Sequence, residues 1–251
     1  TDYNIASSLT DSYDESLLKL RRHESGAGLP ASHNRSQITN LFPLLIASSA
    51  NRKISVLDYG GGGATTYIDC LSSIDMDRVK YYVYDLPKTM KMARKLFPVP
   101  ENGQYNIRFV ENITEVHDID IVYLGSVLQY LPDYAAVLSL IFDKQPERIL
   151  ISDNFMGKHP TYATVQANMS GRRMAYWMFE LNEIIELFKN GGYHLAYKST
   201  NFQPFHHFAN FPVKFRIKDS CNLLFLKLEG CYILFLSLLC YSFVIVFNYF
   251  I

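Results

Sequence analysis

The sequence predicts an α/β fold: a seven-stranded, mostly parallel sheet with its last strand antiparallel, helices on both faces and an N-terminal helical cap. Two observations lead to this prediction. From Lys53 onward, short apolar runs alternate with helical segments, and the first apolar run ends in four consecutive glycines, Gly60–Gly63. Such alternation is typical of parallel sheets, because each parallel connection needs a crossover. The 251 residues, 49% of them hydrophobic, are enough for one large domain with a buried core.

Seven segments have the pattern of strands, and they are 54–59, 79–85, 107–112, 120–127, 148–154, 193–202 and 221–227. Helices are predicted at 64–73, from Pro87 to before Pro98, from Pro132 onward, and at 182–190. The stretch between the fifth strand and the 182–190 helix is predicted to be irregular. Only a loop separates the last two strands, so they are expected to pair antiparallel.

Residues 1–52 are expected to form the helical cap of a domain that covers 53–227. Asp11 or Ser12 can cap a helix over DSYDESLLKLRRH, and Asn34 can cap a second helix over RSQITNLFPLLIASS. The segment between them contains Gly and Pro and is predicted to be a loop.

The C-terminal segment 228–251 differs from the rest of the chain. No charge occurs from Gly230 to Ile251, and a helix of this length would span roughly 33 Å, enough for a bilayer core. Lys214, Arg216 and Lys227 precede it, which favours a cytoplasmic body held at the inner face of the membrane. The alternative is an apolar extension without function.

Charge and cysteine usage exclude several classes of protein. Lys plus Arg and Asp plus Glu number 24 each, so a large nucleic-acid-binding surface is not expected. The four cysteines form no C-x-x-C pair and no zinc-type spacing, which predicts reduced thiols and no metal site.

The ligand site is expected at the carboxyl ends of the strands, where open α/β sheets bind their ligands. The first strand ends in the turn Asp58–Ala64, whose glycines permit close backbone approach to a ligand. Asp85 closes the second strand and can accept both hydroxyls of a ribose. Thr65 stands where the third glycine of a dinucleotide-binding G-x-G-x-x-G turn would fall, which disfavours a nicotinamide cofactor.

Four motifs resemble the class I S-adenosylmethionine (SAM)-dependent methyltransferases, which have a Rossmann-like fold. Asp58-x-Gly60-x-Gly62 resembles their first motif, Tyr84–Pro87 their second, Asp120–Asp133 their fourth, and Asn182–Tyr193 their late helix. The resemblance covers about residues 53–227. It is nearest to a group of bacterial methyltransferases often found with surface-polysaccharide genes.

The resemblance implies SAM as the cofactor and assigns roles to residues at successive strand ends. Gly60 and Gly62 would line the methionine and ribose portion, and Asp58 would order the turn. Asp85 would hold the ribose, and Leu86 would pack on the adenine.

Three further residues would complete the cofactor site. Asn112 would contact the adenine amino group, although many relatives carry Asp there. Ser126 and Gln129 would lie near the methionine end, or else serve as helix-capping and core-edge residues.

The acceptor site and the catalytic base are predicted from cationic and imidazole side chains. Lys158, His159, Arg172 and Arg173 would suit a phosphate-bearing acceptor, with a solvated loop as the alternative. His206 or His207 would supply the base, because imidazole titrates near neutral pH; a surface pair without a role is the alternative.

The function predicted from these features is methyl transfer to a small-molecule or glycan-linked acceptor, at oxygen, in surface-polysaccharide biosynthesis. Two other functions remain open. One is a nicotinamide-dependent oxidoreductase or epimerase. The other is a membrane-tethered binding protein that keeps a methyltransferase fold without catalysis.

Overall fold

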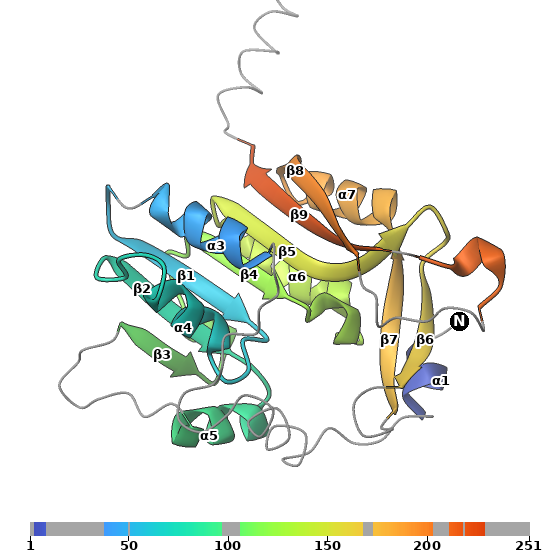
Figure 1. The fold of residues 1–251 in the computed structure, drawn as a ribbon, viewed down its shortest axis with the longest axis horizontal. Helices are drawn as coiled ribbons and strands as arrows, with labels where there is room; N and C mark the ends of the chain where they lie inside the picture. The colour runs from blue at the N-terminus through green and yellow to red at the C-terminus, as the bar shows by residue number, and fades with distance from the viewer. Residues whose placement is uncertain are drawn as a thin grey trace, which may run out of the picture.

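The structure is a computed structural model that describes residues 3–8, 38–49, 51–96, 106–167, 173–202, 211–217 and 219–228. Figure 1 shows its elements, which are α1 (Tyr3–Ser8), α3 (Ile38–Ala47), β1 (Ile54–Tyr59), α4 (Thr65–Leu71), β2 (Val79–Tyr84), α5 (Pro87–Leu96), β3 (Ile107–Val110), η1 (Ile113–Glu115), β4 (Ile121–Gly125), η2 (Leu128–Tyr130), α6 (Tyr134–Asp143), β5 (Arg148–Gly157), β6 (Tyr162–Ala167), β7 (Arg173–Glu180), α7 (Leu181–Asn190), β8 (Tyr193–Phe202), η4 (Val213–Phe215) and β9 (Asp219–Lys227).

The strands form one mixed sheet, and the predicted fold class is confirmed. The main path has the order β3-β2-β1-β4-β5-β7-β6, and β9 pairs with β5 and with β8. Strands β1 to β5 are parallel to one another, whereas β9 is antiparallel to both of its neighbours, as predicted for the last strand. The sheet has nine strands, two more than predicted.

The two additional strands are β6 and β7, in the stretch that was predicted to be irregular. They pair antiparallel along their whole length, from Tyr162↔Met178 to Ala167↔Arg173. They attach to the sheet because β5 continues to Gly157, three residues beyond its predicted end, and pairs there with β7. Figure 1 shows this hairpin beyond the arrowheads of β1 and β4. The prediction of an irregular segment was therefore wrong.

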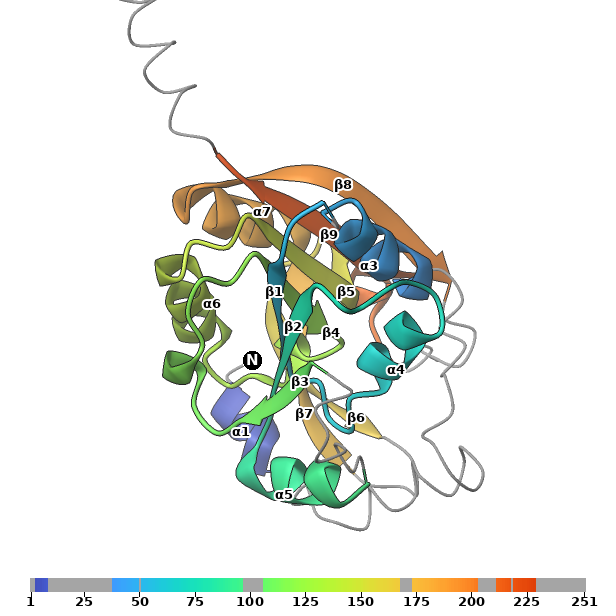
Figure 2. The ribbon, with the colours of Figure 1, turned by 90° about the vertical axis from the view of Figure 1, so that its left-hand side faces the viewer.

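Helices cover both faces of the sheet, as Figure 2 shows, with α6 and α7 on one side and α3 and α4 on the other. Alternation along β1 explains this arrangement, because successive side chains of a strand point to opposite faces. Leu57 and Tyr59 join the core under α6 and α7, whereas Ile54 and Val56 join the core under α3, α4 and α5.

Helix α6 begins later than predicted, and α3 lies against the sheet. α6 begins at Tyr134, two residues after Pro132, because the Asp133 carboxylate accepts a hydrogen bond from the Ala136 N–H at 2.9 Å and caps the helix there. α3 corresponds to the second predicted N-terminal helix. Its Phe42 stacks on Tyr123 of β4 at 4.4 Å between centroids, so α3 belongs to the layer on that face of the sheet.

Several predictions fall on parts of the chain outside the described residues, among them the first N-terminal helix and the apolar segment 230–251. Across the described ranges, no helix has both the length and the apolar character needed to cross a bilayer.

Candidate functional site

Strained backbone marks the carboxyl ends of three adjacent strands. Five non-glycine residues have a positive φ in the described chain, and three of them lie at this edge: Ala64 (φ 60°) after β1, Ser126 (φ 54°) after β4, and Asp153 (φ 56°) in β5 just past its last pair with β4. A left-handed conformation costs a residue with a side chain roughly 1–2 kcal/mol. Such strain is often found at functional sites, so this edge is the candidate site.

The glycine turn after β1 is packed tightly on its inner side and is open on its outer side. A Cβ at Gly60 would lie 2.3 Å from Val127 Cγ2, and one at Gly61 would lie 2.7 Å from Asp58 Cγ. By contrast, a Cβ at Gly62 or Gly63 would meet no atom within 4 Å. The turn therefore leaves open space above Gly62 and Gly63.

Asp58 lies beneath this turn and is only 2% exposed. The Tyr81 hydroxyl donates a hydrogen bond to Asp58 Oδ2 at 2.9 Å. Burial and the nearby Asp58 carboxylate raise the pKa of Tyr81 well above its ordinary value, so this hydroxyl keeps its proton. Asp58 therefore contacts the turn from inside the protein.

Asp85 connects the ends of β1 and β2. Its Oδ2 accepts a hydrogen bond from the Gly62 N–H at 3.0 Å, and its Oδ1 accepts one from the Leu86 N–H at 2.6 Å. A carboxylate has about four lone-pair sites and can therefore accept several hydrogen bonds. Leu86, the next residue, is 60% exposed and presents an apolar side chain at the same edge.

Two tyrosines lie at the ends of these paired strands. The rings of Tyr59 and Tyr84 lie 4.8 Å apart, and their residues are partners in the β1–β2 register. Burial, with smaller contributions from Tyr84 and Asp85, raises the pKa of Tyr59 to about 12.

Asn112 follows β3 at this edge and has a local structural role. Its Oδ1 accepts a hydrogen bond from the Thr114 N–H at 3.0 Å and thereby caps η1.

The ends of β4 and β5 are joined by a buried polar network. The Ser152 carbonyl accepts hydrogen bonds from the Ser126 N–H at 2.9 Å and from Asn154 Nδ2 at 2.7 Å. Gln129 Nε2 donates to Ser126 Oγ at 2.9 Å. Gln129 and Asn154 are 1% and 0% exposed, and Gln129 Oε1 and Asn154 Oδ1 lack a hydrogen-bond partner. Sequence reasoning placed Ser126 and Gln129 here but missed Asn154.

The predicted cationic cluster of the acceptor site is divided by the structure. Lys158 follows Gly157, which pairs with Glu180 at one end of β7. Arg173 begins β7 at its other end, roughly 23 Å away at 3.3 Å per residue. One phosphate cannot contact both side chains, because β7 keeps their backbones apart. Arg172 lies outside the described residues.

His159 is 6% exposed and is packed among aromatic rings. Its Nδ1 lies 2.9 Å from the Pro160 carbonyl, which can only accept, so Nδ1 carries the proton. Its ring lies 5.2 Å from that of Tyr162, edge to face. His159 therefore packs against the start of the β6–β7 hairpin.

His206 and His207 lie outside the described residues. The strand before them, β8, is antiparallel to β9, which is antiparallel to β5. β8 therefore runs in the direction of β5, and its last residue, Phe202, lies toward the carboxyl edge.

Aromatic side chains that sequence reasoning did not single out connect the hairpin to this edge. The Tyr130 hydroxyl donates to Gln166 Oε1 at 2.9 Å, and Trp177 Nε1 donates to the Leu131 carbonyl at 3.1 Å. From the N-terminus, the Tyr3 ring stacks on Trp177 at 5.2 Å, and its hydroxyl donates to the Tyr130 carbonyl at 2.8 Å. The run of consecutive apolar residues in β7 was the signal that could have revealed these contacts.

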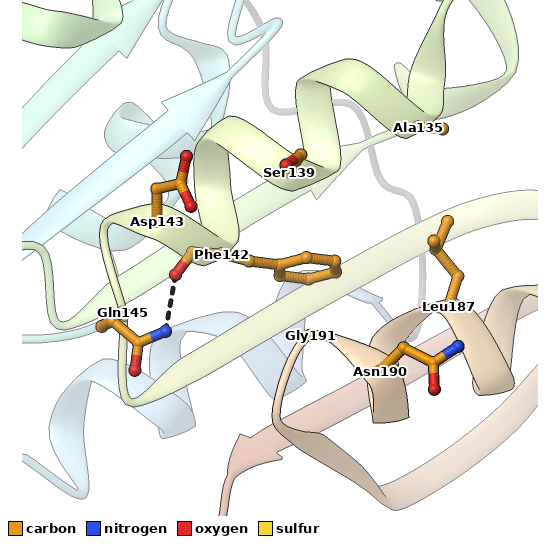
Figure 3. A pocket seen from close by; sticks show the side chains of 8 residues that line it. All are labelled: Ala135, Ser139, Phe142, Asp143, Gln145, Leu187, Asn190 and Gly191. Atoms are coloured by element: carbon orange, nitrogen blue, oxygen red, sulfur yellow. Dashed lines mark hydrogen bonds between the residues drawn. The ribbon is translucent and has the colours of Figure 1, made fainter.

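A groove of about 380 Å³ lies elsewhere, between α6 and α7 (Figure 3). Its lining includes Asp143 and Gln145, just before β5, and Asn190 and Gly191, just before β8. These positions are at the amino ends of the strands, opposite the carboxyl edge that carries the glycine turn. The groove is therefore separate from the candidate site.

The parallel sheet, its antiparallel last strand and the glycine turn at the carboxyl edge form a Rossmann-like α/β fold. A magnesium protoporphyrin IX methyltransferase from Synechocystis PCC 6803, solved with bound S-adenosylhomocysteine (SAH), is similar at a TM-score of 0.55 and 13% identity, over 90% of this chain and 100% of that one. The 1,6-didemethyltoxoflavin-N1-methyltransferase of Burkholderia thailandensis, solved with SAH and 1,6-didemethyltoxoflavin, is similar at 0.51 and 17%, over 85% and 87%.

A SAM-dependent methyltransferase from Methanosarcina mazei is similar at a TM-score of 0.50 and 12% identity, over 74% of this chain and 98% of that one. No family model matches the chain, and no curated protein matches its sequence. At these identities the likeness shows the fold, which is that of class I SAM-dependent methyltransferases. The nearer likeness to a polysaccharide-associated group stays a prediction.

Proposed function

We propose that the chain is a SAM-dependent methyltransferase that acts on a small-molecule acceptor. The observation that carries this proposal is the hydrogen bond between Asp85 Oδ2 and the Gly62 N–H at 3.0 Å. It joins a carboxylate suited to ribose hydroxyls to a turn that is open above Gly62 and Gly63. Two proteins with the same fold were solved with SAH, which supports SAM as the cofactor.

The residues present suit the chemical groups of SAM. The open space above Gly62 and Gly63 would accept the ribose and methionine portion, where any larger residue would intrude. Asp85 would accept bonds from the ribose hydroxyls, and the exposed Leu86 would pack on the adenine. Asn112 would lie beside the adenine amino group, and Ser126 would lie toward the methionine end, where Gln129 Nε2 donates to its hydroxyl.

The proposed reaction requires that the acceptor be aligned with the methyl group and that the acceptor lose a proton. Bound SAM supplies a methyl group that is electrophilic because it is attached to a sulfonium. The strained ends of β4 and β5 would hold the acceptor in line with that methyl group, since fixed geometry lowers the entropic barrier. His206 or His207 would accept the proton of an acceptor hydroxyl. Methylation at oxygen of a glycan-linked acceptor, in surface-polysaccharide biosynthesis, rests on the sequence resemblance.

Titration calorimetry of the full chain with SAM, SAH and NAD tests the proposal. We expect SAM and SAH to bind and NAD not to bind. NAD binding without SAM binding would identify a nicotinamide-dependent enzyme instead. A folded protein that binds none of the three would identify a non-catalytic member of the fold.

A further inference from the structure

Two buried carboxamide oxygens at the ends of β4 and β5 lack a hydrogen-bond donor. They are Gln129 Oε1 and Asn154 Oδ1, on side chains that are 1% and 0% exposed. Burying a polar atom without a partner is unfavourable, and native structures contain few such atoms. Two such atoms at the candidate site call for a physical reason.

The two carboxamides belong to one hydrogen-bonded unit. Asn154 Nδ2 and the Ser126 N–H donate to the same Ser152 carbonyl, at 2.7 and 2.9 Å. Gln129 Nε2 donates to Ser126 Oγ at 2.9 Å. The last pair of the β4–β5 register is Gly125 with Ser152, so this unit lies where the parallel pairing of β4 with β5 ends. In each side chain, the amide nitrogen donates a hydrogen bond that fixes the orientation of the amide, and the amide oxygen has no hydrogen-bond partner.

The orientation of Asn154 follows from its partner. A carbonyl oxygen only accepts hydrogen bonds, so the Asn154 nitrogen must face Ser152 and its oxygen must face away. Gln129 is bonded to a hydroxyl, which both donates and accepts, and its oxygen is the unpartnered atom in the orientation of the structure. Asn154 Oδ1 therefore lacks a donor, and in the orientation of the structure Gln129 Oε1 lacks one as well.

The surroundings disfavour an anionic ligand. Asp153, between Ser152 and Asn154, is half-buried, and its N–H is held by Asn222 Oδ1 at 3.1 Å. The two amide oxygens are the negative ends of dipoles, which repel a phosphate and attract N–H or O–H groups. Lys158 and Arg173 cannot compensate together, because they stand at opposite ends of β7.

We infer that Gln129 and Asn154 bind a hydrogen-bond-donating group of the methyl acceptor, an amino or hydroxyl group, and select against phosphate-bearing acceptors. This inference rests on the proposed function. The same donor chemistry is present in the ammonium group of SAM, so the experiment has to separate the cofactor from the acceptor.

The test uses two probes with one ring and different substituents, 2-aminophenol and phenyl phosphate, titrated by ligand-observed NMR into the SAH-loaded full chain. We expect 2-aminophenol to bind at least about tenfold more tightly than phenyl phosphate. Gln129→Met and Asn154→Leu should each weaken 2-aminophenol about tenfold, the scale of one hydrogen bond of roughly 1.4 kcal/mol. The matched controls Gln145→Met and Asn190→Leu, at the opposite edge of the sheet, should leave its binding unchanged.

Thermal melts of all variants and their SAH affinities complete the design. If Asn154→Leu does not fold, Gln129→Met decides the outcome. Weaker SAH binding with unchanged 2-aminophenol binding would assign the oxygens to the cofactor and overturn the inference. Unchanged binding of both would assign them to an ordered water and would also overturn it. Tighter binding of phenyl phosphate than of 2-aminophenol would also overturn the inference. Failure of the wild-type chain to bind SAH would instead remove the proposed function itself.

Discussion

At the scale of single residues, Gly60 and Gly62 both have left-handed backbone, with φ of 80° and 56°, but their surroundings differ. Gly60→Ala would place a Cβ against Val127, whereas Gly62→Ala would fill open space. We expect Gly60→Ala to destabilise the fold by about 2–4 kcal/mol, from strain plus overpacking. Gly62→Ala should cost only about 1–2 kcal/mol and should weaken SAM binding. Denaturant unfolding and calorimetry check both; equal stability losses would contradict the close contact at Gly60.

Asp85 should contribute directly to cofactor affinity. Asp85→Ala removes the bond to the Gly62 N–H and the proposed bonds to the ribose. Hydrogen bonds to a charged group contribute about 1.5–3 kcal/mol, so SAM binding should weaken by that amount. Asp77→Ala, at an exposed turn before β2, is the control and should bind SAM normally. Calorimetry gives both values, and an unaffected Asp85→Ala would rule out a role in binding.

Tyr59 should make stability depend on alkaline pH. Its folded pKa is raised to about 12 by burial, above the ordinary value of 10.0, so the folded state holds the proton more tightly. The stabilisation is complete below pH 10 and is lost between pH 10 and 12, because the unfolded chain releases that proton first. The loss should reach roughly 2–3 kcal/mol. Tyr59→Phe should show a correspondingly weaker decline in urea unfolding across this range; an identical decline would refute the assignment.

The sequence was informative about residues whose role follows from the end of a strand. Asp58 and Asp85 were located because each ends an apolar run that is a strand in the structure. The left-handed Ser126 follows the last β4–β5 pair, and the left-handed Asp153 lies in the register shift between β5 and β9, so neither could be anticipated from the local sequence. Asn154 escaped notice for the same reason: its burial arises only when β5 continues beyond the main sheet.

At the scale of elements, the β6–β7 hairpin shows what sequence reasoning overlooked. The apolar run Met174–Phe179 in β7 is typical of a buried strand, but the long β5 that receives this hairpin was predicted to stop at Asn154. By contrast, β1 and β8 were predicted to the residue, since apolar character and adjacent turn residues mark their limits. The type of each element could be predicted from its local sequence pattern, whereas the pairing of the hairpin with β5 could not.

The contact between α1 and the β6–β7 hairpin should contribute to the local stability of the hairpin. Tyr3→Ala removes the stack on Trp177 and the hydrogen bond to the Tyr130 carbonyl. The loss of a stack and one hydrogen bond should cost about 1–3 kcal/mol in local stability. Amide hydrogen exchange should accelerate in β6 and β7 while β1 and β2 stay protected. The control is Ser8→Ala, which changes only the exposed end of α1. Uniform acceleration across the sheet would show that α1 acts on global stability instead.

At the scale of the whole molecule, the direction of β9 determines where the C-terminal segment begins. β9 is antiparallel to β5, so it ends at the amino edge, where the Leu228 N–H donates to the Gly192 carbonyl at 2.8 Å. This edge is opposite the candidate site. A segment attached there is not required for the glycine turn or the network of β4 and β5.

The segment 230–251 should therefore be separable from the domain. We expect the full chain to fractionate with membranes and to resist carbonate extraction, because the uncharged segment is long enough to span a bilayer. A chain ending at Leu228 retains all of β9 and should stay in the supernatant with unchanged SAM affinity. If the shortened chain unfolds in a thermal melt, the segment belongs to the folded body and the anchor hypothesis is wrong.

The central claim is that the carboxyl edge holds SAM, and a crystal structure of the protein grown with SAH tests it most directly. The account predicts density above Gly62 and Gly63, with the ribose hydroxyls within hydrogen-bond distance of the Asp85 carboxylate. SAH in the groove between α6 and α7, or a carboxyl edge without SAH at saturating concentration, would contradict it.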